Sequence, residues 1–309
     1  MADFKSRIKH TFPGIFALLH KGRMAVYCLI GRISREKLIG IWYSNMYHKK
    51  IDLVHPQDLD EKINWMKLHT DLSLWTRCAD KAEVRGYVQE KGLGHTLNEC
   101  YGVYDSEKDV DFSAFPDRFV IKTTNGGGSN SVMLVDRTKG FDENEARRTL
   151  GRWLRTRIGH LYVEPHYFGI KPRLLAEKYL EPDEGEASLV DIKIDCFDGK
   201  AYSVLLCSDR APGKSVRLSV YDIDWNIHPE KVLPQYRTDK VYPRPKSFDE
   251  MIRYSEMLSK GIPYVRMDWY EIEGKPVFSE MTFTPAGGFH GYYTMDYLRE
   301  LGDQMTLPL

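Results

Sequence analysis

The sequence predicts an α+β fold with antiparallel or mixed sheets. Residues 1 to about 110 have mainly helical patterns, and from Phe119 onward short strand-like runs alternate with helical segments. Strands joined by tight turns pair antiparallel, whereas a doubly wound parallel sheet needs a long crossover between successive strands. No internal repeat is present. We therefore expect hairpin-based sheets preceded by a mainly helical region.

The individual elements are expected in the following order. Helices are expected from Pro56 onward and at 82–91, 143–157 and 248–260, and Gly92 is expected to end the second of them. Their apolar residues recur every three or four positions, as Leu150, Trp153 and Leu154 do. Strands are expected at 119–124, 131–135, 174–180, 189–197, 200–207 and in both arms of the hairpin 266–282. Turn residues, such as Asp198-Gly199, separate these strand-like runs.

The overall charge argues against nucleic acid as a partner. The chain has 309 residues, and its 44 basic and 44 acidic side chains cancel, so no global positive field attracts a polyanion. Its five cysteines form no CxxC pair and no His/Cys ligand spacing, which disfavours a zinc site and a disulfide framework. We therefore expect a cytoplasmic protein in a reducing compartment.

The N-terminal segment Phe12–Ile33 contains two short apolar runs separated by basic residues. Neither run approaches the roughly 20 apolar residues that span a bilayer, and no signal-peptide cleavage pattern follows. We expect this segment to pack against the body of the protein. The alternative is a basic amphipathic helix that lies on a membrane, which would make the protein a peripheral membrane protein.

The hairpin 266–282 contains the most informative side chains. Two strand-like runs flank Gly274, so the backbone should reverse there. A loop with an odd number of residues would place Asp268 opposite Glu280 and Arg266 opposite Thr282. Opposed carboxylates repel unless a cation lies between them, and hard oxygen ligands suit Mg²⁺. The alternative is a surface hairpin with solvated acidic side chains.

A glycine-rich loop, Asn125–Asn130, joins two predicted strands and lacks the GK[ST] ending of a phosphate-binding loop that precedes a helix. Its bare N–H groups could close over a polyphosphate as a flap. Lys122, on the entering strand, could bind a phosphate oxygen. The alternative is an ordinary glycine turn between strands.

The strand 174–180 could offer backbone groups to an adenine edge, and Glu184 in the acidic loop that follows could accept from ribose hydroxyls. The alternative is a core strand followed by a solvated turn.

The ordered series of motifs resembles the ATP-grasp superfamily and, within it, the TupA-like (teichuronopeptide-biosynthesis) branch found among genes for cell-surface polysaccharides. The resemblance covers roughly residues 50–309, and the motifs that support it are Glu61-Lys-Ile-Asn-Trp-Met-Lys, Asp80-Lys81, Phe-Val-Ile-Lys122 with Gly-Gly-Gly-Ser, Ala-Glu177-Lys-Tyr-Leu, Asp191-Ile-Lys193 and Arg266-x-Asp268…Glu280-x-Thr282-x-Thr-Pro. It implies ATP clasped between two α+β subdomains. The implied division is a helical region at 1–110, a small subdomain with the flap at 111–182 and a C-terminal subdomain with the metal site at 183–309.

The resemblance also implies roles for individual residues. Arg266 and Lys193 would be catalytic, with a backbone nest at 284–288 beside Arg266. ATP would be bound by Lys81, Lys122, Gly126, Gly127, Gly128, Ser129, Glu177, Lys178, Leu180 and Glu184. Mg²⁺ would be held by Asp268, Glu280 and Thr282. Most members of the superfamily have Asn where this chain has Thr282, a weaker donor that would bind a second metal less tightly or through water; the TupA-like branch also has Thr there.

The implied activity is a carboxylate–amine ligation through an acyl phosphate. The substrates implied by the branch are an acidic sugar, such as a uronic acid of a capsular or other cell-surface polysaccharide, and an amino acid or small amine. Three alternatives stay open: a kinase of a sugar or glycan hydroxyl, a glycosyltransferase that uses the DxD-like Asp222-Ile-Asp224, and a nucleotide-binding module without turnover.

Overall fold

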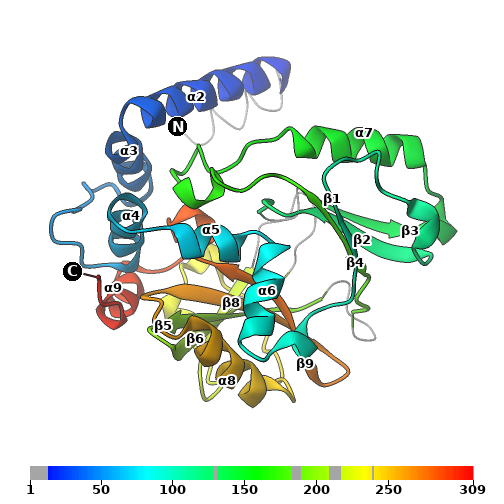
Figure 1. Ribbon diagram of the computed structural model, residues 1–309. Helices are drawn as coiled ribbons and strands as arrows, with labels where there is room; N and C mark the ends of the chain where they lie inside the picture. Colours follow the sequence, from blue (N-terminus) through cyan, green and yellow to red (C-terminus); the bar gives the residue numbers. More distant parts are fainter. Residues whose placement is uncertain (1–12, 128–130, 183–188, 209–216, 239, 309) are drawn as a thin grey trace.

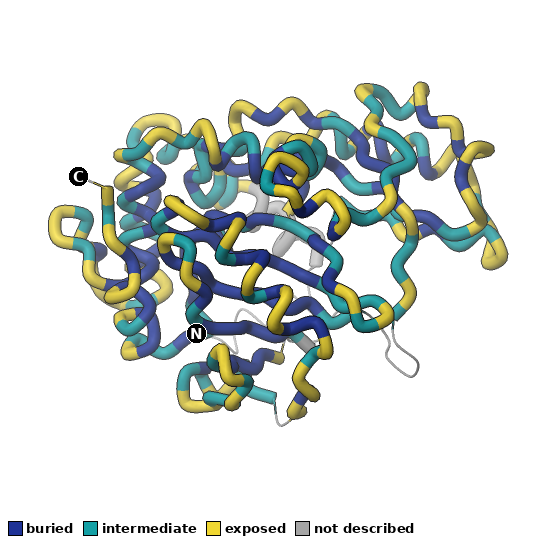
Figure 2. Tube along the Cα trace, turned by 60° about the horizontal axis from the view of Figure 1, so that its bottom comes forward, coloured by how far each residue is buried: buried dark blue, intermediate teal, exposed yellow. Residues whose placement is uncertain are grey.

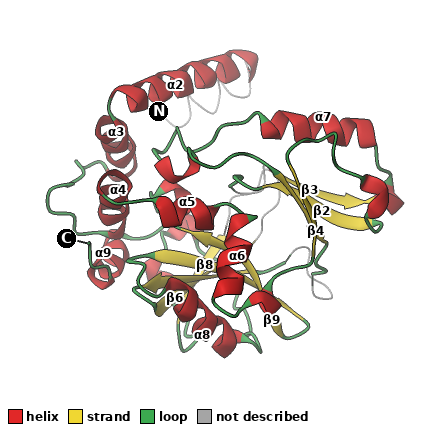
Figure 3. Ribbon diagram, viewed as in Figure 1, coloured by secondary structure: helices red, strands yellow, loops and turns green. Residues whose placement is uncertain are grey.

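The computed structural model describes residues 13–127, 131–182, 189–208, 217–238 and 240–308. Two antiparallel sheets and a set of helices confirm the predicted α+β class (Figures 1 and 3). The small sheet has the strand order β1-β4-β2-β3 and the large sheet has the order β7-β6-β5-β8-β9.

The small sheet contains β1 (Cys100–Tyr104), β2 (Arg118–Thr123), β3 (Val132–Asp136) and β4 (Leu174–Lys178). Residues of β2 alternate between buried and partly exposed, as expected for a strand with one face on a core. That core is shared with the amphipathic helix α7 (Glu143–Leu154) and includes Phe119, Ile121 and Leu150. Strand β1 was not predicted; it lies within the mainly helical region and pairs with β4.

The large sheet contains β5 (Asp191–Phe197), β6 (Lys200–Ser208), β7 (Arg217–Asp222), β8 (Val265–Ile272) and β9 (Lys275–Thr282). Asp198 and Gly199 form the predicted turn, and both have positive φ angles, 46° and 80°, which suit a two-residue hairpin loop. Every residue of β5 is buried. The first five residues of β8 and the middle of β7 are buried as well, and Figure 2 shows such buried stretches along the strands. Helix α8 (Phe248–Ser259) packs against this sheet.

The remaining helices are α2 (Pro13–Ile33), α3 (Arg35–Tyr47), α4 (Leu59–His69), α5 (Ser73–Ala79), α6 (Glu83–Glu90) and α9 (Met295–Gln304). Short 3₁₀ turns lie at Gly94–Thr96, Phe112–Ala114, Arg137–Lys139, Pro165–Tyr167, Pro229–Lys231 and Pro234–Tyr236. Helix α4 begins with a capping box between Asp58 and Glu61, which satisfies the free N–H groups of its first turn. Lys62 of α4 donates to the carbonyls of Gly302 and Met305 and so fixes α9 against it.

Helix α6 connects the two sheets. Arg85 donates to Glu177 of β4 in the small sheet, and the Tyr87 hydroxyl donates to the carbonyl of Leu258 in α8, which covers the large sheet. Helix α6 therefore links the small sheet to the helix that covers the large sheet.

Helix α2 packs on the body through part of its surface, as the described side chains of residues 22–33 show. Tyr27 and Ile30 are partly buried against the cluster of α3 and Phe289, and Tyr27 makes an edge-on ring contact with Trp42. Val26, Leu29 and Ile33 are instead exposed to 53%, 57% and 75%. The predicted packing against the body thus holds for one face of this helix. No helix in the described ranges is both long and apolar enough to cross a membrane.

Candidate active site

The hairpin of β8 and β9 places Asp268 opposite Glu280 and Arg266 opposite Thr282, as predicted. The route to this register differs from the expectation. The turn holds two residues, Glu273 and Gly274, with φ angles of 52° and 72°. The register then shifts between Asp268 and Trp269, and this bulge supplies the extra residue that we had assigned to the loop.

The cation between the two opposed carboxylates is the Arg266 guanidinium. Its Nε lies 2.7 Å from Asp268 Oδ1, and its Nη2 lies 2.7 Å from Asp268 Oδ2, 3.4 Å from Thr282 Oγ1 and 4.0 Å from Glu280 Oε1. Oxygen atoms of the three predicted metal ligands therefore surround one positively charged group. Hard oxygen donors gathered around one point fit a Mg²⁺ ion in their chemistry.

Asp268 is buried and fully engaged. Lys193 Nζ lies 2.5 Å from Asp268 Oδ2 and 3.2 Å from Asp191 Oδ2, and the Asp268 side chain is 1% exposed. Burial alone would lower the pKa of Arg266 and of Lys193, but Asp268 reverses this and raises both. Both cations therefore stay charged, and together they neutralise Asp268.

Glu280 is the accessible acid of the pair. Its side chain is 29% exposed; Oε2 accepts from Lys81 at 2.9 Å and Oε1 accepts from the Thr282 hydroxyl at 3.3 Å. Partial burial favours the neutral acid, but the charges of Lys81, Lys193 and Arg266 outweigh burial and lower the pKa of Glu280. Glu280 is thus an ionised carboxylate that a ligand can reach. Among the described residues, no group of three or more His, Cys, Asp or Glu side chains is arranged to hold a metal, so a metal here would need the Thr282 hydroxyl as well.

Lys81 joins the glycine-rich loop to the large sheet. Its Nζ lies 2.7 Å from the carbonyl oxygen of Gly126 and 2.9 Å from Glu280 Oε2, and its backbone N–H donates to Thr124 at 2.9 Å. The neighbouring Asp80 accepts backbone N–H groups at the start of α6 and a bond from Arg173, which fixes the lysine in place. Two predicted site residues 199 positions apart are therefore in direct contact.

Lys122 forms an ion pair with Glu177 rather than standing free. Lys122 Nζ lies 2.6 Å from Glu177 Oε2, and Arg85 Nη1 lies 3.0 Å from Glu177 Oε1. The Glu177 side chain is 7% exposed, so its carboxylate is enclosed between these two cations. Arg85 was missed by the sequence analysis because its place depends on how α6 packs on β4.

The predicted adenine contacts divide into two cases. Both backbone groups of Lys178 are used: its N–H donates to the carbonyl of Glu99 at 3.0 Å, and its carbonyl accepts from the Asn98 side chain at 2.8 Å. The residues that precede the unpredicted strand β1 therefore bond both backbone groups of Lys178, and neither group is left unbonded for adenine in this structure. Leu180 lies beyond β4 and has no backbone hydrogen-bond partner among the described residues.

The start of the glycine-rich loop requires glycine. A Cβ at Gly126 would lie 1.9 Å from Ser131 Oγ and 2.5 Å from Thr123 Oγ1, whereas Gly127 is exposed with open space around it. The loop therefore brings β2 and β3 together more closely than a side chain would allow. Gly128 and Ser129 of the predicted flap, and Glu184 of the acidic loop, lie outside the described residues.

The predicted backbone nest at 284–288 is closed rather than open. Its residues Ala286, Gly287 and Gly288 have positive φ angles, but the Gly287 and Gly288 N–H groups donate to the carbonyls of Thr284 and Pro285. These two N–H groups are therefore not available to an oxyanion, and we correct that expectation. The buried Lys67 stabilises this turn: its Nζ lies 2.5 Å from the Gly287 carbonyl oxygen and 2.9 Å from Asn64 Oδ1. Its position at the end of the motif 61–67 was the only sequence signal for it.

Asp222, the first acid of the DxD-like sequence, serves its own turn. Its carboxylate accepts from the backbone N–H groups of Asp224 and Asn226, from the Asn226 side chain and from His228. Slight burial would raise the pKa of Asp222, but the bonds from Asn226 and His228 lower it to about 2. This acid closes a turn, and no observation favours glycosyl transfer.

Solved structures similar to this chain include an ATP-grasp ligase and D-alanine–D-alanine ligases. The D-alanine–D-alanine ligase of Bacillus anthracis is 16% identical, with a TM-score of 0.42, over 74% of this chain and 67% of that one. The ATP-grasp ligase PsnB with its minimal precursor is 14% identical, with a TM-score of 0.43, over 79% and 65%. The D-alanine–D-alanine ligase of Helicobacter pylori is 12% identical, with a TM-score of 0.44, over 81% and 67%.

This chain therefore spans about two thirds of the length of each of these structures. All three TM-scores lie below 0.5, so the family assignment does not rest on them. No curated protein matches the chain. The protein family described as TupA-like ATPgrasp matches residues 61–306, a range that includes the Lys81, Lys122 and Arg266–Thr282 motifs. This protein belongs to the TupA-like ATP-grasp family.

Proposed function

We propose that this protein is an ATP- and Mg²⁺-dependent carboxylate–amine ligase that acts through an acyl phosphate. The observation that supports this most is the set of contacts between the sheets: Lys81 bridges Gly126 and Glu280, next to Arg266, Lys193 and Asp268. This arrangement offers several cations to a polyphosphate and one accessible acid to a divalent ion. It offers charge and alignment, which phosphoryl transfer needs more than a protein nucleophile.

The two lysines at the boundary of the sheets are proposed to bind phosphate oxygens. Lys81 and Lys122 are each paired with a carboxylate, Glu280 and Glu177 respectively. Arg85 stays beside Glu177 when Lys122 leaves, so the exchange of partners leaves no buried carboxylate unpaired. The glycine-rich loop starts at Gly126, whose carbonyl accepts from Lys81, and is proposed to cover the phosphates. Leu180 is the remaining candidate for a backbone contact with adenine.

Mg²⁺ is proposed to be held by Glu280 and Thr282, with Asp268 as the third ligand. A bound Mg²⁺ would neutralise charge on the triphosphate and orient it. Glu280 is the natural first ligand because it is ionised and partly exposed. Asp268 is paired with two cations, so its contribution requires a shift of Arg266 or an intervening water.

The reaction begins with a substrate carboxylate that attacks the γ-phosphorus of ATP, giving an acyl phosphate and ADP. An amine then attacks the acyl carbon, the tetrahedral intermediate loses phosphate, and an amide forms. Arg266 and Lys193 are proposed to stabilise the negative charge that develops in both steps, since preorganised cations are most effective in a site that excludes water. Their ion pairs with the buried Asp268 fix their orientation beforehand.

The substrates are proposed to be an acidic sugar, such as a uronic acid of a cell-surface polysaccharide or its precursor, and an amino acid or small amine. Membership of the TupA-like family supports this choice. A cytoplasmic location is proposed as well, and the five free cysteines fit a reducing compartment.

Trapping of the intermediate tests this proposal. The full chain is incubated with ATP, Mg²⁺, a uronic acid and hydroxylamine; a ligase should release ADP and give a hydroxamate, because hydroxylamine attacks acyl phosphates. A stable phosphomonoester on the sugar, with no hydroxamate, would contradict the ligase and identify a kinase instead. The Glu280→Gln variant serves as the blank.

A further inference from the structure

The exposed face of α2 is apolar. Val26, Leu29 and Ile33 follow one another at intervals of three and four residues, so they lie on one side of the helix. Their exposed fractions exceed one half, while Tyr27 and Ile30, on the adjoining side of the helix, contact the body of the protein. A stripe of this kind is a surface for a partner of low polarity.

Two segments of this part of the molecule contain no acidic residues. Between Pro13 and Arg35 the chain contains no Asp or Glu, and its basic residues there are Lys21, Arg23, Arg32 and Arg35. Between Ala146 and Val163 it again contains no Asp or Glu, and its basic residues are Arg147, Arg148, Arg152, Arg155 and Arg157. In a protein whose 44 basic and 44 acidic side chains balance, two such segments concentrate positive charge locally.

The two acid-free segments meet in the folded chain. The carbonyl oxygen of His160, in the loop after α7, lies 3.7 Å from the position that a Cβ on Gly31 would occupy. Contacts that reach just beyond these segments hold the same regions together: the Arg35 Cζ lies 5.7 Å from the centroid of the Phe168 ring, and the Trp42 indole donates to the carbonyl of Leu161. Helices α2 and α7 lie along the same edge of the molecule, the upper one in Figure 1.

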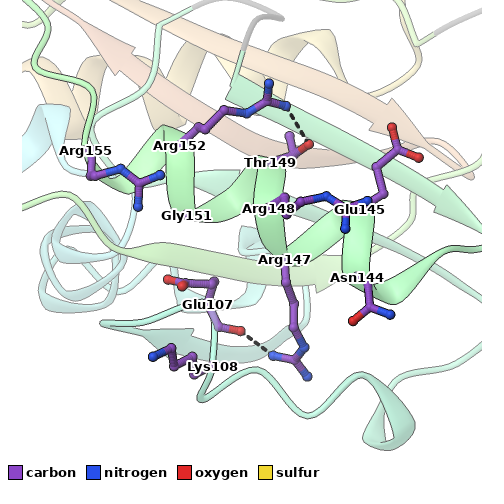
Figure 4. A pocket seen from close by; sticks show the side chains of 10 residues that line it. All are labelled: Glu107, Lys108, Asn144, Glu145, Arg147, Arg148, Thr149, Gly151, Arg152 and Arg155. Carbon is purple, nitrogen blue, oxygen red and sulfur yellow. Dashed lines mark hydrogen bonds between the residues drawn. The ribbon is translucent and has the colours of Figure 1, made fainter.

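An open groove of about 720 Å³ is lined by the arginines of α7 and also by Glu107 and Glu145 (Figure 4). Arg147 has a structural role there, since it is bonded to Glu143 and to the carbonyls of Glu107 and Val110. Arg148 and Arg155 are exposed, and in the described part of the chain their side chains have no ion-pair or hydrogen-bond partner. Together with Arg152, they are spaced at four and three residues along one side of the helix.

Exposed arginines without acidic partners attract an anionic surface, and an apolar helix face beside them requires an environment less polar than water. A bilayer with anionic lipids supplies both, because its headgroup phosphates bind arginines and its acyl boundary accepts apolar side chains. An acidic glycan would match only the arginines. The combination therefore favours a lipid surface.

We propose that α2 and the arginine side of α7 form a membrane-docking surface for anionic lipids. Val26, Leu29 and Ile33 enter the interface between headgroups and acyl chains, and Arg148, Arg152 and Arg155 contact lipid phosphates. This inference goes beyond the proposed ligase activity and does not depend on it.

Sedimentation of the full chain with vesicles tests this surface. Vesicles of phosphatidylcholine alone are compared with vesicles that contain equal parts of phosphatidylcholine and phosphatidylglycerol. We expect binding to the anionic vesicles to be at least tenfold stronger, on the order expected for several basic residues near a charged surface. Raising the salt from about 0.1 M to about 1 M should abolish most of this difference, since the Debye length falls from ~10 Å to ~3 Å.

Two variants and two matched controls locate the surface. The triple variant Arg148→Gln, Arg152→Gln, Arg155→Gln and the double variant Leu29→Ser, Ile33→Ser should each weaken binding by about tenfold. The control for charge is Lys200→Gln, Lys260→Gln, Lys275→Gln, which removes three exposed lysines from the large-sheet side. The control for apolar contact is Ile223→Ser, Val241→Ser, at side chains that are 44% and 67% exposed. Both controls should bind as the original chain does.

Equal binding by the arginine variant and its control would overturn the proposal, as would equal binding to neutral and anionic vesicles. Binding to a polyuronate in solution without binding to anionic vesicles would also overturn it and would identify an acidic glycan as the partner. Circular dichroism and thermal unfolding of each variant verify that the fold is retained.

Discussion

Two carboxylates that face each other in one hairpin differ sharply in their surroundings. Asp268, on the interior strand β8, is buried and bound by Arg266 and Lys193. Glu280, on the edge strand β9, is partly exposed and bound by Lys81. Lys81 also donates to the carbonyl of Gly126 in the glycine-rich loop. Asp268 orients cations inside the protein, whereas Glu280 is accessible enough to exchange its partner Lys81 for a ligand. The site thus combines a fixed charge cluster with an adaptable one.

The largest expected effect is on stability, and it tests whether Asp268 has the fixed structural role described above. Replacing Asp268 by Ala leaves Arg266 and Lys193 without their common counter-ion in a buried site. We expect the free energy of unfolding to fall by about 3–5 kcal/mol, the usual cost of breaking a buried ion pair from one side. Urea unfolding of the two proteins measures this difference. A loss below about 1 kcal/mol would mean that Asp268 is no more fixed than a surface acid.

Activity should respond most to Glu280. The Glu280→Gln variant removes the accessible charge without removing volume, so we expect ATP turnover to fall by about 100-fold or more while the protein stays folded. Glu273→Gln, an exposed acid in the turn of the same hairpin, is the matched control and should keep its turnover. Near-normal turnover of Glu280→Gln would refute the metal-ligand role of Glu280.

Lys122 should affect nucleotide binding rather than folding. In Lys122→Ala, Glu177 keeps its bond to Arg85, so the small sheet should stay intact. We expect the affinity for ATP to fall by about tenfold, since one charge-assisted hydrogen bond to phosphate is lost. Calorimetric titration with ATP measures this change. The control is Lys178→Ala, whose side chain is exposed on the adjacent strand; an equal loss in both variants would dismiss Lys122 as a specific phosphate ligand.

The smallest expected effect is a dependence of stability on pH. The pKa of Glu280 is lowered in the folded protein, so its ion pairs stabilise the fold above the ordinary glutamate pKa of about 4.3. This contribution is lost as the pH falls below that value toward the folded-state pKa. The stability difference between the original chain and Glu280→Gln should therefore be constant near neutral pH and shrink in acid. A difference that grows in acid would contradict the lowered pKa.

Local sequence patterns predicted the elements well, because hairpins and amphipathic helices are encoded by neighbouring residues. The opposition of Asp268 and Glu280 was predicted, but the bulge that produces it was not. The bulge leaves Ser279 without a paired residue on β8, and the amino-acid sequence around Ser279 contains no feature that indicates a bulge. The pairing of Lys81 with Glu280 depends on two sheets packing together, which no local pattern encodes; only the resemblance to a family placed both residues in one site.

The errors have physical causes of the same kind. Strand β1 was missed because residues 100–104 form a short, partly exposed edge strand. The residues just before β1, Asn98 and Glu99, form hydrogen bonds with the backbone groups of Lys178. The nest at 284–288 was expected from the resemblance to the family, yet the turn uses two of its own N–H groups. Glycine content predicts a tight turn, but not the partner to which the turn directs its donors.

A crystal structure with Mg²⁺ and a non-hydrolysable ATP analogue tests the central claim most directly. We expect a divalent ion at about 2.1 Å from a Glu280 oxygen, the usual Mg²⁺–oxygen distance, with Lys81 and Lys122 moved from their carboxylates to phosphate oxygens. A triphosphate bound away from β9, or lysines that keep their pairing with Glu280 and Glu177 in the complex, would contradict this account.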